Sequence, residues 1–388
     1  MREAREARRF STDHSRNAAW SMLLCACSGE AGRRQLAGLF HSPPNWDALL
    51  SLADRHGVNA HLAEALKGFA GVPGAVQQEL QRRRRAQALA ALAMTADLFR
   101  ILTAFQKTNI EALAIKGPVL SMRAYGDPGI RHYGDLDFLI RSSDAERATQ
   151  ILAEAGYAPR VPLSAIRAGR VPGEYLFEHA STGMLAELHT EQSLRYFPKA
   201  LPVEEYFARQ CAVEIDSRGV PALSPEDEVV HICIHGSKHL WERLAWIADV
   251  AAILRGTSAL DWNLVMQSAD RTGASRMLVL GAVLATDLLG APLPPQLNRR
   301  DRDRRLMSRV AAGIEQRLPA ATSDSGIWKR AAYRVATGGG GASGLRYFCR
   351  VAFSTTEKDW PVETSGAALP DSLARRLLRL ARLYSKRS

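Results

Sequence analysis

The chain has 388 residues, of which 46% are hydrophobic and 23% are charged. These values exclude a wholly disordered chain and leave room for two or three domains. Lysine and arginine exceed aspartate and glutamate by 51 − 40 = 11, which favours a phosphate-rich partner without choosing among nucleotide, nucleic acid and membrane surface.

Cysteine usage and hydropathy favour a cytoplasmic location. The five cysteines are irregularly spaced, which is not typical of a disulfide framework and fits a reducing compartment. The apolar stretch near the basic N-terminus is too short for a typical signal peptide. Asp97 and Arg100 interrupt the apolar run at 87–105, so we expect no stable membrane insertion.

Residues 1–108 are predicted to form an N-terminal helical domain. Asn45 is suited to cap a helix, and a long helix is predicted to begin after Pro73. The run Arg82–Arg85 lies early in that helix. We interpret it as a solvated helix face. The alternative, a nucleic-acid patch, lacks the interleaved aromatic residues that would support it.

Residues 109–195 have the pattern of a small α/β core. The predicted order is a strand, a helix, a strand, a helix and then two strands joined by a Ser-Thr-Gly turn. The corresponding segments are 110–117, 118–125, 135–140, 142–157 and 174–193.

Residues 196–388 are predicted to form a C-terminal helical domain. Ser224 precedes Pro225 and three acidic residues, which is typical of a helix start. Further helices are predicted at 261–271, 275–290, 301–317 and 366–385. The predicted fold class is therefore α+β, with a small mixed sheet flanked by N- and C-terminal helical domains.

Acidic residues alternate with apolar ones on two of the predicted strands. In "DLDFLI", Asp135 and Asp137 point to the face opposite Leu136 and Phe138, and in the last strand Glu187 shares its face with the histidine two residues later. If the two strands are neighbours, three carboxylates lie within metal-binding distance. Oxygen ligands without thiolates favour Mg²⁺ or Mn²⁺, and two such ions are typical of in-line displacement at phosphorus. The alternative is an acidic pair on a solvent-facing strand.

Basic residues flank the aspartates. Lys116 and Gly117 end the first strand where a helix begins, which is a place where backbone amides and an ammonium group can meet phosphate. Arg131 precedes the aspartate pair by four residues and is a candidate to hold a phosphate or the pair itself.

Together these motifs resemble the nucleotidyltransferase fold of the polymerase-beta type. The stretch "LAIKGPVLSMRAYGDPGIRHYGDLDFLI", followed by "AELHT", is similar to a bacterial nucleotidyltransferase family, with Lys-Gly in place of the usual Gly-Ser. The resemblance covers about 110–195 and extends weakly to "HGSKHLWERLAWIADV". The usual serine, which contacts the triphosphate in the wider superfamily, is absent, and the spacing to the aspartates is longer than usual.

The resemblance implies roles for individual residues. Asp135 and Asp137 would bind both metal ions, Glu187 would complete the metal that activates the acceptor oxygen, and Lys116 with Gly117 would hold phosphate. The implied cofactor is Mg²⁺ or Mn²⁺, and the implied substrate is a nucleoside triphosphate.

Three histidines recur at helical spacing in the C-terminal part. His231, His235 and His239 lie along one helix face. One interpretation is that His235 and His239, with Lys238, face the cleft and contact nucleotide or acceptor. Zinc ligation and ordinary packing at a domain seam are the alternatives. Trp241 and Asp249 are expected to pack or to cap a helix.

The expected function is metal-dependent transfer of a nucleoside monophosphate to an acceptor hydroxyl or phosphate, with release of pyrophosphate. By the resemblance, the acceptor is a small molecule or peptide in a biosynthetic pathway. Two alternatives stay open. A tRNA acceptor, as in toxin-like nucleotidyltransferases, would suit the arginine clusters and would give strongly salt-dependent binding. A catalytically idle nucleotide-binding scaffold would suit the missing serine.

Overall fold

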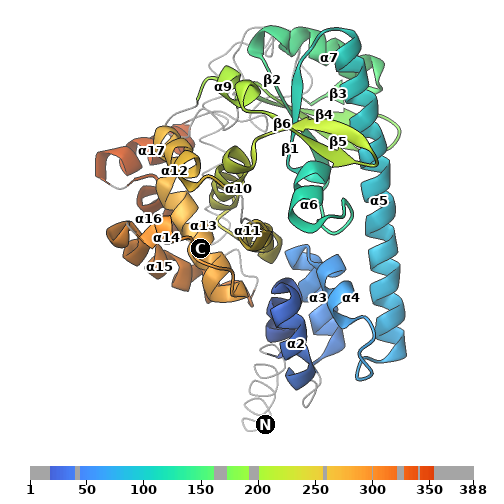
Figure 1. The fold of residues 1–388 in the computed structure, drawn as a ribbon, viewed down its shortest axis with the longest axis vertical. Coiled ribbons are helices and arrows are strands. Elements are labelled where there is room, and N and C mark those ends of the chain that lie inside the picture. Colours follow the sequence, from blue (N-terminus) through green and yellow to red (C-terminus); the bar gives the residue numbers. More distant parts are fainter. Residues whose placement is uncertain are drawn as a thin grey trace.

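A seven-stranded mixed sheet forms one end of the molecule (Figure 1). The computed structural model describes residues 18–39, 44–160, 173–191, 201–256, 260–298, 300–320, 327–339 and 341–353. The strands are β1 (Ala112–Ile115), β2 (Asp135–Ile140), β3 (Tyr157–Pro159), β4 (Glu174–His179), β5 (Leu185–His189), β6 (Cys211–Ile215) and β7 (Arg218–Ala222). Their order in the sheet is β3-β4-β5-β2-β1-β7-β6. The predicted α+β class is confirmed.

Helices precede, interrupt and follow the sheet. The first group is a helix at Ala18–Cys27, α2 (Gly29–Leu39), α3 (Trp46–His56), α4 (Asn59–Leu66) and α5 (Gly74–Lys107). Within the sheet region are α6 (Gly117–Tyr125), a 3₁₀ turn (Ser142–Asp144), α7 (Ala145–Glu154) and α9 (Val203–Ala208). The last group is α10 (Pro225–Lys238), α11 (Leu244–Gly256), α12 (Trp262–Thr272), α13 (Ser275–Leu289), α14 (Pro295–Asn298), α15 (Asp301–Glu315), α16 (Ile327–Thr337) and α17 (Gly341–Phe353). The helix predicted at 366–385 lies outside the described residues.

Strand β3, which directly follows the helix predicted at 142–157, was not predicted. Strands β6 and β7 were not predicted either, because only helices were expected after residue 196. They form a hairpin whose turn residues, Asp216 and Ser217, both have positive φ angles, 48° and 61°. This is the backbone of a type I′ turn, built without the Asn-Gly or Asp-Gly pair that usually identifies one. Pro221 lies in β7 and weakens the strand pattern further. β7 pairs in parallel with β1, with Ala114 opposite Ala222.

Alternate side chains of β2 project from opposite faces of the sheet and belong to different apolar clusters. Leu136, Phe138 and Ile140 are at most 1% exposed and belong to an apolar core formed with α5 and α7. Leu139 belongs to a separate, smaller cluster with Tyr206 of α9. The aspartates of β2 share this second face with Leu139, because strand side chains alternate. The sheet is therefore covered on both faces, and the acids lie next to the second, smaller apolar cluster.

The N- and C-terminal helices are joined by one apolar cluster within the described residues. Leu49 and Leu62 of the first helices belong to the same buried cluster as Trp241, Leu244 and Leu280. In Figure 1, α10 and α11 lie centrally, between the sheet and the last helices. The domain boundaries proposed at 108 and 195 stay a prediction. The N- and C-terminal helices share one apolar core, and β6 and β7, which follow residue 195, belong to the same sheet as β1 to β5.

The arginine run on α5 is largely used in internal ion pairs. Arg83 pairs with Asp54 of α3 at 2.5 Å, and Arg84 pairs with Asp127 at 2.6 Å. Both side chains are less than 20% exposed, whereas Arg82 and Arg85 are exposed. The interpretation as a solvated face therefore holds for the outer two arginines, and the inner two tie α5 to neighbouring elements.

Helix α5 is long and apolar enough to cross a membrane by length and composition, although Asp97 and Arg100 were expected to interrupt its apolar run. The two charges that interrupt its apolar run, Asp97 and Arg100, make contacts within the fold. The carboxylate of Asp97 is 7% exposed, accepts a hydrogen bond from the Tyr157 hydroxyl and pairs with Arg100. Leu98, Ile101 and Phe105 on the same helix are buried in the core with the sheet. These contacts pack the C-terminal part of α5 against the sheet.

Candidate active site

The strands β2 and β5 bring the predicted carboxylates together. They pair in parallel, and Asp137 lies directly opposite Glu187. Directly opposed residues project from the same face of a sheet, so the side chains of Asp135, Asp137 and Glu187 share one face, as the alternation predicts. We call these three residues the acidic cluster.

Two cationic groups already contact the central aspartate. Lys116 Nζ is 2.7 Å from Asp137 Oδ1, and His189 Nε2 is 2.9 Å from the same oxygen. His189 Nε2 is also 3.4 Å from Glu187 Oε2. The other oxygen, Asp137 Oδ2, is buried and has no hydrogen-bond partner. His189 was not among the predicted site residues. Its position two residues after Glu187, on the same strand face, was the available signal.

These contacts set the protonation of the site. Burial opposes the charge of Asp137, but Lys116 and His189 hold its pKa well below the usual range. The negative charge of Asp137, together with burial, raises the pKa of Asp135 to about 6. Burial disfavours the charged form of His189, yet its hydrogen bonds to Asp137 and Glu187 raise its pKa to about 10. At neutral pH the site therefore combines carboxylates with an ammonium and an imidazolium group.

The turn from β1 into α6 places a helix N-terminus beside the acidic cluster. Ile115, the last residue of β1, lies opposite Asp137 in the antiparallel pair β1–β2. Lys116 follows with φ 59° and ψ −142°, a conformation that costs a non-glycine residue about 1–3 kcal/mol. Gly117 begins the helix with φ 45°, and Pro118 follows. The first amides of a helix lack intrahelical acceptors and attract anions. The structure has a helix start at Gly117, and phosphate binding there stays a prediction.

Arg131 pairs with Asp249 and not with the aspartate pair of β2, which its place in the sequence had suggested. Its Nε is 2.8 Å from Asp249 Oδ2 in α11, and the other Asp249 oxygen accepts a hydrogen bond from the Tyr125 hydroxyl at 2.9 Å. Asp249, expected to pack or cap, is thus a buried counter-ion. The charge of Arg131 still lowers the pKa of Asp135, as a smaller effect than the charge of Asp137. Its role toward phosphate stays a prediction.

The histidines of α10 lie within electrostatic reach of Lys116. His231 is 6% exposed, and neither ring nitrogen has a hydrogen-bond partner. Burial and then the charge of Lys116 lower the pKa of His231 to about 3, and the same two causes lower that of His235 well below its usual value. The ring centroids of His235 and His239 are 4.7 Å apart. Within the described residues, the group with metal-ligand spacing is Asp137, Glu187 and His189, so these histidines do not favour the zinc alternative.

A fourth carboxylate joins α10 to the sheet. Lys238 Nζ is 3.3 Å from both carboxylate oxygens of Glu174 on β4. Glu174 lies directly opposite His189 in the β4–β5 pair, so it projects from the same face as the acidic cluster. Glu174 was not among the predicted site residues, because only the strand register shows that it belongs to this face.

The donor set fits a hard divalent cation. Carboxylate oxygens of Asp137 and Glu187 lie within 4.8 Å of each other and of a ring nitrogen of His189, and Asp135 adds a carboxylate on the same face. The charged His189 contacts both carboxylates and is not itself a ligand in this protonation state. Asp137 Oδ2 is an unpartnered buried oxygen, which is costly unless a cation or donor satisfies it. Carboxylate oxygens without thiolates are the ligands that Mg²⁺ and Mn²⁺ prefer.

Comparison with known proteins identifies the family. The sequence model described as "Uncharacterised nucleotidyltransferase" matches residues 42–290, which is more than half of the chain. The chain belongs to this family. The protein is therefore a transferase of the nucleotidyltransferase type. The matched region takes in α3 to α13 as well as the sheet, and so extends well beyond the 110–195 that the sequence motifs covered.

Other similarities add little to the family assignment. The solution structure of the antibiotic-resistance factor ANT(2'')-Ia is similar over 58% of this chain and 96% of its own, at 14% sequence identity and a TM-score of 0.29. At that TM-score the similarity says nothing about the chemistry of this nucleotidyltransferase. No curated protein sequence matches the chain.

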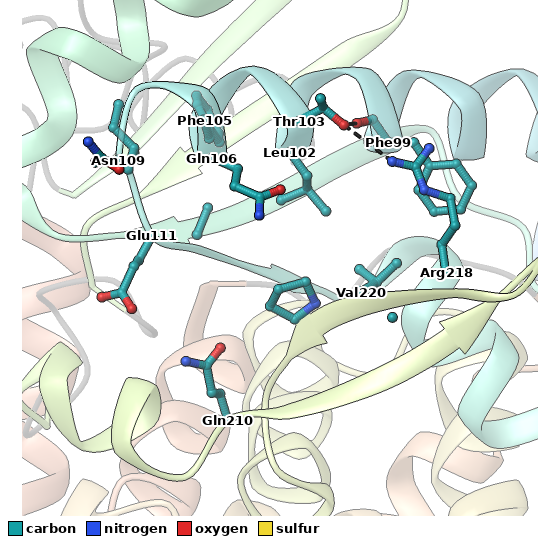
Figure 2. Close-up of a pocket in the computed structure, with 14 residues that line it drawn as sticks. Phe99, Leu102, Thr103, Phe105, Gln106, Asn109, Glu111, Gln210, Arg218 and Val220 are labelled. Atoms are coloured by element: carbon teal, nitrogen blue, oxygen red, sulfur yellow. Dashed lines mark hydrogen bonds between the residues drawn. The ribbon is translucent and has the colours of Figure 1, made fainter.

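A separate groove of about 490 Å³ lies at the other end of β1, between the end of α5 and the β6–β7 hairpin (Figure 2). Arg218 lies over the Phe99 ring at 4.4 Å and donates a hydrogen bond to Thr103. Gln106 and Gln210 face each other across the groove in Figure 2. Residues at the start of β1 line this groove, whereas the acidic cluster lies level with the last residue of β1. The groove is therefore distinct from the candidate active site.

The raised pKa of Asp135 predicts a stability effect that depends on pH. Its pKa in the folded protein, about 6, lies above its ordinary value of 3.8. The folded state therefore binds more protons between about pH 4 and pH 6, and the free energy of unfolding of the metal-free protein falls as pH rises through this window. Above about pH 6, the ionised Asp135 lowers the free energy of unfolding by on the order of 2–3 kcal/mol, at about 1.36 kcal/mol per pKa unit.

We accordingly expect Asp135→Asn to stabilise the metal-free protein at pH 7.5 and to have little effect at pH 4. Urea unfolding in the presence of EDTA at the two pH values measures the difference. Asp216→Asn in the exposed β6–β7 turn is the control, because asparagine tolerates the positive φ angle there. An equal effect of Asp135→Asn at both pH values would contradict the pKa assignment.

Proposed function

We propose that this nucleotidyltransferase uses a divalent metal to transfer a nucleoside monophosphate from a nucleoside triphosphate to an acceptor hydroxyl or phosphate, releasing pyrophosphate. The observation that carries the proposal is the unpartnered Oδ2 of Asp137 between Asp135 and Glu187, next to the N-terminus of α6. Mg²⁺ or Mn²⁺ bound there would neutralise the triphosphate and lower the pKa of the attacking group.

The residues of the chain would divide the remaining work. Asp135, Asp137 and Glu187 would hold the metal, and Glu187 would take the proton from the acceptor hydroxyl as its oxygen bonds to the α-phosphorus and pyrophosphate leaves. Lys116 and the α6 amides would bind phosphate. Because His189 bridges Asp137 and Glu187, it would fix the orientation of both carboxylates.

Residues of α10 and the loop before β2 would contact the substrates. His235 and Lys238 lie in α10 and His239 caps its C-terminus, and we propose that these three residues contact nucleotide or acceptor. Arg131 would act on phosphate through the part of its guanidinium group that Asp249 does not hold. The acceptor is proposed to be a small molecule or a peptide, and the protein is expected in the cytoplasm, without stable membrane insertion.

A transfer assay tests the proposal directly. The pure protein is incubated with Mg²⁺, each α-labelled nucleoside triphosphate and candidate small-molecule, peptide and tRNA acceptors. We expect labelled acceptor and an equal amount of pyrophosphate with at least one pair, both abolished by EDTA. Transfer to tRNA with strongly salt-dependent binding would favour the RNA alternative. If no pair yields pyrophosphate, the idle nucleotide-binding scaffold is the better account.

A further inference from the structure

Lys116 supplies the counter-charge of the acidic cluster in the protein without bound metal. Its ammonium nitrogen is 2.7 Å from Asp137 Oδ1, and the two side chains are 9% and 1% exposed. Although burial lowers it, the pKa of Lys116 is raised overall by the charges of Asp137, Asp135 and Glu187. A buried carboxylate needs such a neutralising cation. The ammonium group thus acts on all three carboxylates that are candidates to hold a divalent ion.

The backbone holds Lys116 in this position under strain. Because Ile115 lies opposite Asp137, the next residue is already level with the acidic cluster where the chain turns into α6. Lys116 has φ 59° and ψ −142° there, a conformation that residues with a side chain rarely adopt and that is often found at functional sites. The same turn places Lys116 at the start of the helix whose first amides can bind phosphate.

The ammonium group and a divalent ion cannot share the acidic cluster without repulsion. Two cations a few ångströms apart repel strongly in a partly buried site. Asp137 Oδ2 remains without a partner while Oδ1 is occupied by Lys116 and His189. The carboxylate therefore offers an open position to the ion but carries a competing positive charge beside it.

We propose that Lys116 is an exchangeable counter-ion: its ammonium group neutralises Asp137 in the metal-free protein and leaves this carboxylate when a divalent ion binds, so that it becomes available to the phosphates of the nucleotide. The inference rests on the proposed function, because it takes the acidic cluster as the metal site. It accounts for the lysine at a turn where a phosphate-binding serine is usual, and it explains how the carboxylates stay together without metal.

Removing the competing charge should strengthen metal binding. Mn²⁺ binding without nucleotide is measured by electron paramagnetic resonance for the wild type, Lys116→Met and Lys107→Met, the last an exposed lysine at the end of α5. We expect Lys116→Met to bind Mn²⁺ at least about tenfold more tightly than the wild type, and Lys107→Met to match the wild type. Equal or weaker binding by Lys116→Met would overturn the proposal, because the ammonium group would then assist the ion or ignore it.

The exchange can also be followed in the wild-type protein, so the test survives if Lys116→Met fails to fold. Trace acetylation by acetic anhydride, read by mass spectrometry at each lysine, reports how available an amine is. We expect Mg²⁺ to raise the acetylation rate of Lys116 several-fold relative to EDTA, while that of Lys107 is unchanged. A rate for Lys116 that is unchanged or lower with Mg²⁺ would overturn the proposal.

The counter-ion inference and the proposed function can fail separately. If transfer requires metal but neither measurement on Lys116 shows competition, the counter-ion inference is wrong and the proposed function stands. If both measurements show competition but no nucleoside triphosphate gives transfer, the inference stands and the proposed reaction is wrong.

Discussion

Asp137→Asn is expected to lower kcat of nucleotidyl transfer by at least about 10³-fold, because bound metal contributes several kcal/mol of transition-state stabilisation and about 1.36 kcal/mol corresponds to a factor of ten. The substitution preserves the size of the side chain and removes the charge that Lys116 and His189 contact. The measurement is the transfer assay under saturating nucleotide, with the acceptor found for the wild type.

Two further measurements make this result specific to the site. Asp216→Asn makes the same chemical change in the exposed β6–β7 turn, away from the acidic cluster, and should retain wild-type kcat. Circular dichroism and thermal unfolding establish the temperature at which Asp137→Asn is folded, because loss of the carboxylate leaves Lys116 and His189 without their shared counter-ion. A folded Asp137→Asn variant with full transfer would show that the metal site has been assigned to the wrong carboxylate.

The acidic cluster could be predicted because its geometry is local to two strands. On β2, Leu136 and Phe138 are buried in the core while Asp135 and Asp137 project from the other face, and two-residue periodicity alone predicts this. On β5, Glu187 has the same alternation. The sequence could not show the register of the pair, and it is the register that places Asp137 opposite Glu187.

Contacts that depend on tertiary structure could not be predicted from the sequence. Glu174 joins the site because β4 pairs with β5 and because α10 brings Lys238 to its carboxylate. The partner of Arg131 is 118 residues away, in a helix of the C-terminal part. No periodicity links such residues, since their approach is decided by how helices pack on the sheet. The β6–β7 hairpin was missed for a local reason, its unusual turn and Pro221.

Breaking the buried ion pair between Arg131 and Asp249 is expected to reduce the free energy of unfolding more than any other substitution proposed in this chain. Both side chains are less than 10% exposed, and Asp249 also accepts the hydrogen bond of Tyr125. Asp249→Ala leaves a buried guanidinium group without a counter-ion, so we expect the free energy of unfolding to fall by about 3–5 kcal/mol. Urea unfolding measures it. Asp270→Ala, which breaks an exposed pair with Arg300, should cost less than about 1 kcal/mol.

A double variant separates the structural role of this pair from a role in catalysis. Replacing both charges, as in Arg131→Met with Asp249→Leu, removes the uncompensated charge, and replacing a buried ion pair by apolar residues is often neutral for stability. We expect the double variant to recover most of the stability lost in Asp249→Ala. If Arg131 also holds phosphate, this folded variant will show a raised KM for the nucleotide. An unchanged KM would make Arg131 a structural residue that links the loop before β2 to α11, and phosphate binding would then be left to Lys116 and the α6 amides.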